Sequence, residues 1–305
     1  MKVVTIKVFA LLGAGFILSC SVAGAQRPRK ATTFGGGRTI TIISEPKAIV
    51  WIDEIRRGVT DDNGRLSSLK LSPGAHHLRV RAMGFRESAI PISPAQRGDT
   101  TVRLVRTTDQ AELVFQKAEE ARENARDDNG RRSSAELYRQ AINLRPAFAS
   151  AHVGLARVLL DMNDTNGAVA EIDAARAARA IYPEASAVEG RIYRETGQTE
   201  EAIGAFNRAI REAHGFQPEA HVGIGRVYEE KGQYELAARE FKIAIDQLAD
   251  TEPIIYQLLG AAYEKSGNNA SAIAAYENYL RLAPNGSLGP ALRSIVEQLK
   301  SQRPE

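Results

Sequence analysis

The chain has 305 residues, of which 43% are hydrophobic and 25% charged, and it carries a formal net charge of +3 at pH 7. This composition is that of an ordinary folded chain rather than a disordered or fibrous one, and the length predicts about two domains. The only cysteine is Cys20, which excludes an intrachain disulfide and a cysteine-based zinc site.

Residues 1–25 predict a secretory signal peptide. Two lysines precede an apolar run over residues 8–18, and Ala23-Gly24-Ala25 supplies a small-x-small cleavage site. The run is shorter than the roughly 20 residues that a membrane span needs. As an alternative, Ile17-Leu18-Ser19-Cys20 resembles a bacterial lipoprotein signal, which would leave Cys20 acylated as a lipid anchor. Both versions predict an exported chain in the periplasm or cell envelope, without a transmembrane span in the mature protein.

Residues 26–38 are basic and rich in glycine, and they predict a flexible tether. From Thr39 the hydrophobic pattern has period two, and turn residues separate short runs such as Ala48 to Ile52 and His77 to Arg81. Asp53-Glu54 and Gly58 stand where we expect turns. Several short strands at this spacing predict a small antiparallel β-sandwich over residues 39–106.

The same segment resembles the PEGA domain of bacterial surface proteins. The resemblance rests on Ser44-x-Pro46, Val50-x-Ile52-Asp53, Gly58-x-Thr60, Leu71-x-Pro73-Gly74-x-His76 and Gly84-Phe85. Two departures concern glycines. The glycine of the naming motif is missing between Pro46 and Ala48, and Glu54 stands where a glycine is usual.

Two features of this β domain could carry a function. His76 and His77 are adjacent on a strand, so they point to opposite faces and cannot chelate one ion together. Trp51, the only tryptophan, is either part of a packed face or an exposed ring that stacks on sugar. The second possibility leaves glycan binding open.

The remainder of the chain repeats with a nearly constant period. One large residue recurs at spacings of 34, 34, 35 and 35, at Tyr138, Ile172, Phe206, Phe241 and Tyr276. A fixed period of this length marks a repeat array of helix pairs. Small residues such as Ala156 and Gly225 precede the large ones at helical spacing, which lets two helices cross closely.

These positions resemble the tetratricopeptide repeat, whose pattern is matched nearly in full between Ile224 and Ala244. The resemblance implies an all-α solenoid over residues 107–284. Its five repeats would span residues 111–146, 147–183, 184–217, 218–252 and 253–284. Residues 285–305 predict a capping helix with a short tail, because Leu292, Ile295 and Leu299 form an apolar stripe that covers the last repeat.

The repeat pattern also makes local predictions. Each repeat consists of a first and a second helix. Gly197, Gly232 and Gly267 should each end the first helix of a repeat by adopting the left-handed conformation. Thr199 should cap a second helix, and a proline should close each repeat. In the first repeat the residues Asp127 to Gly130 predict a lengthened turn.

A candidate binding surface follows from the residue after each small crossing residue. Arg157, Arg191 and Arg226 stand there, one repeat apart, and Ala261 ends the series. Solenoids of this family bind partners in the concave groove of their first helices, so the arginines predict a ladder for an acidic or C-terminal carboxylate segment. Arg194, Glu195, Glu229 and Glu230 lie close in sequence, which leaves internal pairing of the ladder as the alternative. His152 and His221, at equivalent repeat positions, predict core packing rather than a metal pair.

Charge and motifs limit the functions further. Residues 26–106 carry a net charge of +8 and residues 107–305 a net charge of −7. The basic residues 26–106 could therefore associate with an anionic envelope surface. The acidic array and the export signal disfavour nucleic-acid binding. The sequence has no glycine-rich phosphate loop, metal-ligand cluster or nucleophile elbow, so it predicts no catalytic site, cofactor or metal.

The fold class that we predict is α+β multidomain: a small antiparallel β-sandwich followed by an all-α tetratricopeptide solenoid with a C-terminal capping helix. The leading functional hypothesis is a non-catalytic exported scaffold or adaptor that binds a protein or peptide partner in the groove of its array. The alternatives are a cell-wall or glycan-associated envelope protein that binds through the β domain, and an accessory factor in outer-membrane assembly or secretion.

Overall fold

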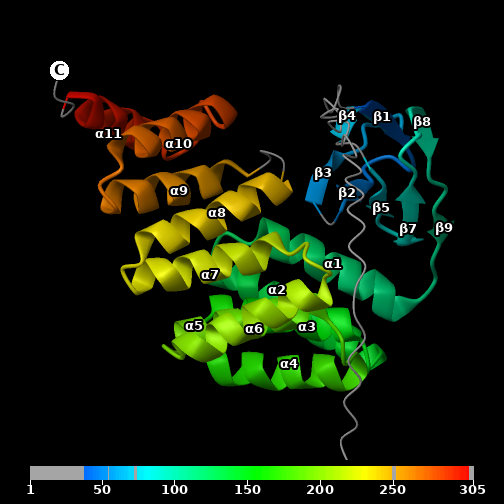
Figure 1. The fold of residues 1–305 in the computed structure, drawn as a ribbon. Coiled ribbons are helices and arrows are strands. Elements are labelled where there is room, and N and C mark those ends of the chain that lie inside the picture. Colours follow the sequence, from blue (N-terminus) through cyan, green and yellow to red (C-terminus); the bar gives the residue numbers. More distant parts are fainter. Residues whose placement is uncertain (1–37, 54, 72–73, 249–251, 302–305) are drawn as a thin grey trace, which may run out of the picture. The chain divides into compact units, whose positions relative to one another are not determined.

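The computed structural model describes residues 38–53, 55–71, 74–248 and 252–301 (Figure 1). The predicted signal peptide with Cys20, the tether up to residue 37, Glu54, Pro73 and the tail after Ser301 lie outside the described residues. Among the helices that the structure describes, none combines the length and the apolar character that crossing a membrane requires.

The first part of the described chain is a β domain with three sheets. The strands are β1 (Arg38–Ile43), β2 (Ile49–Ile52), β3 (Ile55–Val59), β4 (Arg65–Leu71), β5 (His76–Arg81), β6 (Phe85–Arg86), β7 (Ser88–Ile92), β8 (Gly98–Thr101) and β9 (Val105–Arg106). One sheet has the order β4-β1-β8, the second has the order β3-β2-β5-β7, and β6 pairs with β9. β1 begins at Arg38, which the sequence assigned to the tether. The buried guanidinium of Arg38 donates to the backbone oxygens of Gly74 and Pro94, at 2.7 and 3.0 Å.

Alternating apolar residues form the core of this domain, as the period-two pattern predicts. Ile42, Val50, Leu78 and Val80 are 0% exposed. Every other residue of a strand points to the same face, so one face of each sheet becomes apolar. The predicted antiparallel arrangement holds for all strand pairs in the described residues except β1 with β8, which run parallel.

Lys47, which stands where the naming motif has its glycine, has an unusual backbone conformation. Lys47 replaces the missing glycine at the third position of the turn from Glu45 to Ala48, and its φ is +57°. A positive φ at this position, after a proline, is typical of a type II turn and favours glycine. Gly58 was expected in a turn, but it lies inside β3 opposite Val50, next to a shift in register. That prediction was wrong because glycine also serves β-bulges.

Eleven helices follow in the described residues. They are α1 (Gln110–Asn124), α2 (Asp128–Leu144), α3 (Ala149–Asp161), α4 (Thr165–Ala178), α5 (Pro183–Glu195), α6 (Thr199–Glu212), α7 (Pro218–Glu230), α8 (Tyr234–Leu248), α9 (Pro253–Lys265), α10 (Asn269–Leu282) and α11 (Gly289–Ser301). They pack as consecutive pairs, α1 with α2 through α9 with α10 (Figure 1). This architecture confirms the predicted fold class of a small β domain followed by a helical solenoid.

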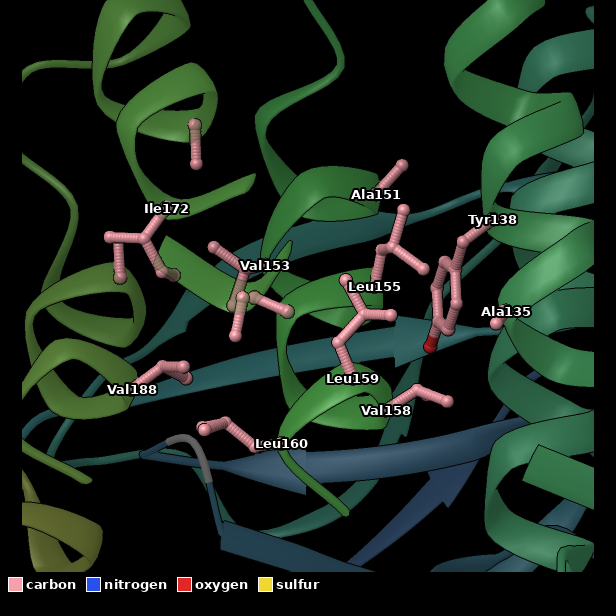
Figure 2. Close-up of a cluster of buried hydrophobic side chains, with 14 of the residues drawn as sticks. Ala135, Tyr138, Ala151, Val153, Leu155, Val158, Leu159, Leu160, Ile172 and Val188 are labelled. Atoms are coloured by element: carbon pink, nitrogen blue, oxygen red, sulfur yellow. The ribbon is translucent and has the colours of Figure 1, made fainter. Parts of the chain in front are cut away.

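Small and large residues interlock where the helices cross. Phe206 of α6 and Phe241 of α8 are 2% and 0% exposed. A Cβ atom built on Gly190 would lie 2.6 Å from Phe206, and one built on Gly225 would lie 2.5 Å from Phe241. Such distances are shorter than van der Waals contact, so the helices reach this separation only with glycine. Figure 2 shows the same packing around Tyr138, between Ala135 of α2 and Leu155 and Leu159 of α3.

Several local predictions are confirmed and others are wrong. Gly197, Gly232 and Gly267 have φ of +76°, +70° and +77°, as expected for helix ends. Thr199 does not cap α6, because the amide of Ala202 bonds to the backbone oxygen of Gln198 and makes Gln198 the N-cap residue. Pro183, Pro218 and Pro253 open first helices instead of closing repeats. Proline is favoured there since the first amides of a helix have no internal partner.

The turn of the first repeat is not lengthened. Asp127 is the N-cap residue of α2, and its carboxylate accepts a hydrogen bond from the amide of Gly130 at 2.8 Å. The extra residues therefore extend α2 at its start. At the other end of the array, the predicted capping helix is α11, which buries Leu292, Val296 and Leu299 against α10.

Candidate functional site

The three arginines of the predicted ladder lie on successive first helices. Arg157 is on α3, Arg191 on α5 and Arg226 on α7, each one residue after a buried Ala or Gly. All three are partly exposed. The repeat spacing thus predicted their elements correctly, and their partners decide whether they can bind a ligand.

Arg157 is paired inside the molecule. Its Nη2 lies 2.7 Å from Oε2 of Glu219 on α7, and the side chains are 25% and 47% exposed. The negative charge of Glu219 is the main cause that raises the pKa of the Arg157 guanidinium above its usual value. Glu219 was not among the partners that the sequence suggested, because 62 residues separate it from Arg157.

Arg191 is paired more completely. Its Nη2 lies 2.7 Å from Oδ1 of Asp161 on α3, and its Nε lies 2.8 Å from Oε1 of Glu195 on its own helix. The neighbouring Arg194 contacts Glu195 at 3.6 Å and Glu230 of α7 at 3.7 Å. Internal pairing, the alternative that the sequence left open, therefore describes two of the three arginines.

Arg226 is different. Within the residues that the structure describes, its guanidinium has no hydrogen bond or ion pair. Burial, followed by the nearby charge of Arg226, lowers the pKa of Arg194, although Glu230 opposes this shift. Arg194 and Arg226 therefore lie close enough between α5 and α7 for their charges to interact.

A cavity of about 410 Å³ lies at this position between α5 and α7. Its polar lining includes Arg191, Arg194 and Arg226 together with Glu195 and Glu219. Its apolar lining comes from Ala187, Phe206, Val222 and Gly223. Glu195 and Glu219 already pair with other arginines, so Arg226 is the arginine of this lining that has no ion pair within the described residues. This arrangement suits a ligand group that has a single negative charge next to an apolar side chain.

The two equivalent histidines pack between helices, as expected. Nδ1 of His152 lies 2.6 Å from Oε2 of Glu171 on α4, and its Nε2 lies 2.9 Å from the backbone oxygen of Pro146. His221 makes the same kind of contact with Glu240 of α8 at 2.7 Å. Both partners of His152 are acceptors, so these contacts favour the imidazolium form, which donates from both ring nitrogens. The hydrogen bond to Glu171 is the main cause that raises the pKa of His152.

The β domain offers less to a ligand. His76 pairs with Asp53 in the turn after β2, while the ring of His77 is exposed. Trp51 is 8% exposed, and the guanidinium carbons of Arg79 and Arg81 lie 4.2 and 5.1 Å from its ring centre. The tryptophan is thus part of a packed face, and arginines occupy the surface that a sugar would need for stacking.

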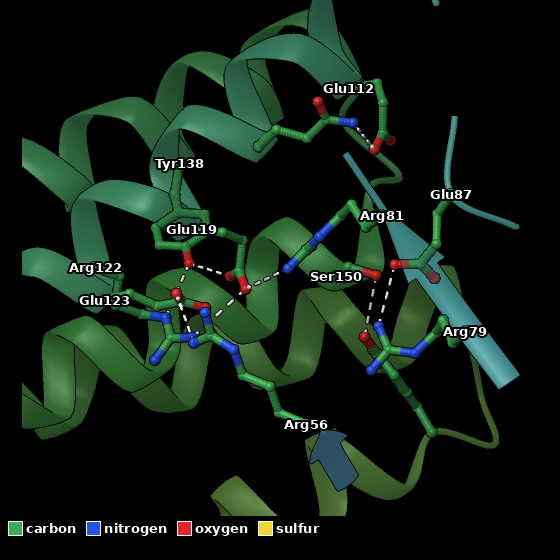
Figure 3. Close-up of polar contacts among 12 residues, drawn as sticks. Arg56, Arg79, Arg81, Glu87, Glu112, Glu119, Arg122, Glu123, Tyr138 and Ser150 are labelled. Atoms are coloured by element: carbon green, nitrogen blue, oxygen red, sulfur yellow. Dashed lines mark hydrogen bonds and ion pairs between the residues drawn. The ribbon is translucent and has the colours of Figure 1, made fainter. Parts of the chain in front are cut away.

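A buried polar cluster around Glu119 of α1 is not apparent from the sequence. The hydroxyl of Tyr138 donates to Glu119, and the Nε of Arg122 donates to the same hydroxyl at 3.2 Å (Figure 3). Arg81 of β5 adds a contact with Glu119 at 3.6 Å. These cations lower the pKa of Glu119 even though burial opposes the shift. Glu119 is therefore a charged group that fixes the first helix pair, and no repeat pattern predicts a carboxylate there.

Three overlapping stretches match the family model of the tetratricopeptide repeat, at residues 153–218, 187–253 and 222–287. Together they run from α3 to the loop after α10. No curated protein matches the chain. The first helix pair and the β domain lie outside these matches.

Solved structures resemble the helical part. A thermophilic tetratricopeptide repeat protein of Thermus thermophilus is 22% identical with a TM-score of 0.53, covering 63% of this chain and 99% of that chain. PilW, a type IV pilus biogenesis factor, is 13% identical with a TM-score of 0.53, covering 64% and 93%. The pilF protein of Pseudomonas aeruginosa is 15% identical with a TM-score of 0.51, covering 63% and 89%. At these identities the likeness shows the fold alone.

Proposed function

From the premise that α3 to α10 form an array of tetratricopeptide repeats, we propose that the chain is a non-catalytic scaffold that binds a protein or peptide partner on its first helices. The partner segment presents a carboxylate, from an acidic side chain or a C-terminus, to Arg226. The observation that carries this proposal is the absence of any partner for Arg226 in the described residues, beside the cavity between α5 and α7.

The lining of the cavity supports a short and specific contact. A guanidinium binds a carboxylate through two parallel hydrogen bonds, which fixes the direction of the ligand. Val222 and the ring of Phe206 give an apolar wall next to this charge. Desolvation around the pair strengthens its attraction relative to an exposed surface pair. A partner anchored at Arg226 can then extend along α7 and α9.

Site-specific crosslinking tests this proposal. A photoreactive residue at Val222 should capture one defined protein in intact cells, whereas the same residue at exposed Ile243 of α8 should not. Substituting Arg226→Gln should remove the captured product. If Val222 and Ile243 give the same products, the array does not bind a partner at this cavity.

Export to the periplasm or cell envelope belongs to the same proposal. The charged start, apolar run and Ala23-Gly24-Ala25 support cleavage before Gln26, and Cys20 supports the lipid-anchored alternative. The intact mass of the protein purified from cell fractions distinguishes cleavage before Gln26 from lipid attachment at Cys20. Cleavage before Gln26 leaves a chain without cysteine, whereas acylation leaves a lipid mass on Cys20. A full-length chain in the cytoplasm contradicts both.

A further inference from the structure

The ion pair between Arg157 and Glu219 differs in its connectivity from the other ion pairs on the first helices. Arg191 with Asp161 joins α5 to α3, and Lys265 with Glu229 joins α9 to α7, so each of these pairs links neighbouring repeats. Arg157 with Glu219 joins α3 to α7 and passes α5, which lies between them in the array. The two side chains can meet only where the first helices of the second and fourth repeats converge.

The helix between α3 and α7 lines the same cavity as Glu219. Ala187 of α5 is small and 0% exposed, and it lines the cavity together with Glu219 and Val222 of α7. Glu219 thus belongs both to the ion pair with Arg157 and to the lining of the cavity that holds Arg191, Arg194 and Arg226.

From this arrangement we infer that Arg157 and Glu219 form an electrostatic latch that holds the second and fourth repeats together and narrows the cavity between α5 and α7. When the pair opens, α3 and α7 separate and the cavity widens. The inference concerns the regulation of the groove, and its role in binding rests on the proposed function above. The latch itself exists without any partner.

The strength of the pair suits a latch. Both side chains are partly exposed, so the attraction is screened and small compared with the total stability of a domain. A pair of this kind biases a two-state equilibrium by up to about five-fold. A partner segment that enters the cavity and displaces Glu219, one of its lining residues, can therefore open the latch without unfolding the array.

Distance measurements between spin labels test the latch directly. The full chain with Cys20→Ser has no other cysteine, so labels can be placed at exposed Asn166 on α4 and exposed Glu235 on α8. In Glu219→Gln or Arg157→Gln, the population at long label distance should rise by up to about five-fold over the wild type. In the wild type, about 1 M NaCl should produce the same rise relative to about 0.05 M.

Two further variants serve as controls. Glu229→Gln removes an ion pair from the same helix α7, but that pair joins neighbouring repeats at 2.7 Å, so the distances between labels should stay unchanged. The charge swap of Arg157→Glu with Glu219→Arg should restore the wild-type distribution. If Glu219→Gln and the wild type give superimposable distributions at both salt concentrations, there is no latch. Because no partner is present, that result leaves the proposed binding function standing.

Discussion

Gly223 of α7 and Phe206 of α6 are in direct contact across two repeats: a Cβ atom added to Gly223 would lie 2.3 Å from Cζ of the phenylalanine ring. Gly190 approaches the same ring from its own repeat, with a corresponding distance of 2.6 Å. The ring of Phe206 thus fills the space between two first helices, and glycines on both sides set their separation. The separation of α5 and α7 at this point therefore depends on the absence of a side chain at Gly190 and Gly223.

We predict that Gly223→Ala lowers the free energy of unfolding by about 1–3 kcal/mol, because the added methyl group overpacks the contact with Phe206. Gly204→Ala on α6 is the matched control. Nothing lies within 4 Å of its built Cβ, so the helix should gain about 0.4–1 kcal/mol from the less flexible residue. Denaturant titrations of both variants check this, and equal midpoints would contradict the packing argument.

At the turn around Lys47 we predict a substitution that raises the stability of the chain. Lys47 is exposed and has a φ of +57°, a conformation that costs a non-glycine residue about 1–2 kcal/mol. Lys47→Gly should raise the stability of the β domain by up to about 1 kcal/mol, since glycine adopts this φ without strain. Lys47→Ala keeps the Cβ atom and should give no gain. Thermal unfolding of the three chains distinguishes these outcomes.

His152 should make stability depend on pH. Its pKa in the folded chain is raised, whereas in the unfolded chain it lies near 6.5, so the folded state binds the proton more tightly. The stabilisation is complete below about pH 6.5 and is lost as the pH rises through the raised pKa. The melting temperatures of the wild type and His152→Gln should therefore differ most in acid and converge at alkaline pH. His214→Asn, at an exposed position, should parallel the wild type; a constant gap for His152→Gln would disprove the imidazolium.

Tyr138→Phe tests the cluster around Glu119. The ring shape is kept, but Glu119 loses the hydroxyl that donates to it and remains next to Arg122 and Arg81. A buried hydrogen bond to a charged group contributes about 1.5–3 kcal/mol, so the variant should lose up to this amount in an unfolding titration. Tyr193→Phe on α5, where no hydroxyl contact occurs in the described residues, should stay within about 0.5 kcal/mol of the wild type.

The sequence predicts the helical array well because its signals are local. Residues at fixed offsets, such as Gly225 with Phe241, share one helix pair, and glycines such as Gly232 end helices by their own conformational freedom. The parallel pairing of β1 with β8 could not be predicted, since strand alternation shows which face is buried but not which strand is the neighbour. The N-cap of α6 was predicted at Thr199, one residue too late, because several polar residues near the start of a helix can serve as its cap.

The candidate site could be predicted only in part. The repeat period places Arg157, Arg191 and Arg226 on equivalent first helices, and the structure agrees. The pairing of Arg157 could not be predicted, because its contact with Glu219 requires the packing of three successive repeats. The cluster at Glu119 was missed since a charged residue in a helix is usually solvated, and only the contact with Tyr138 shows otherwise.

The measurement that tests the central claim most directly is the yield of partner crosslinked from Val222 in intact cells, compared between the wild type, Arg226→Glu and Arg211→Glu. Arg211 is exposed on α6 and lies outside the cavity, so its variant makes the same change in net charge. We predict that Arg226→Glu loses the crosslinked partner while Arg211→Glu keeps it at the wild-type yield. Equal yields from the two variants would contradict a binding site at Arg226.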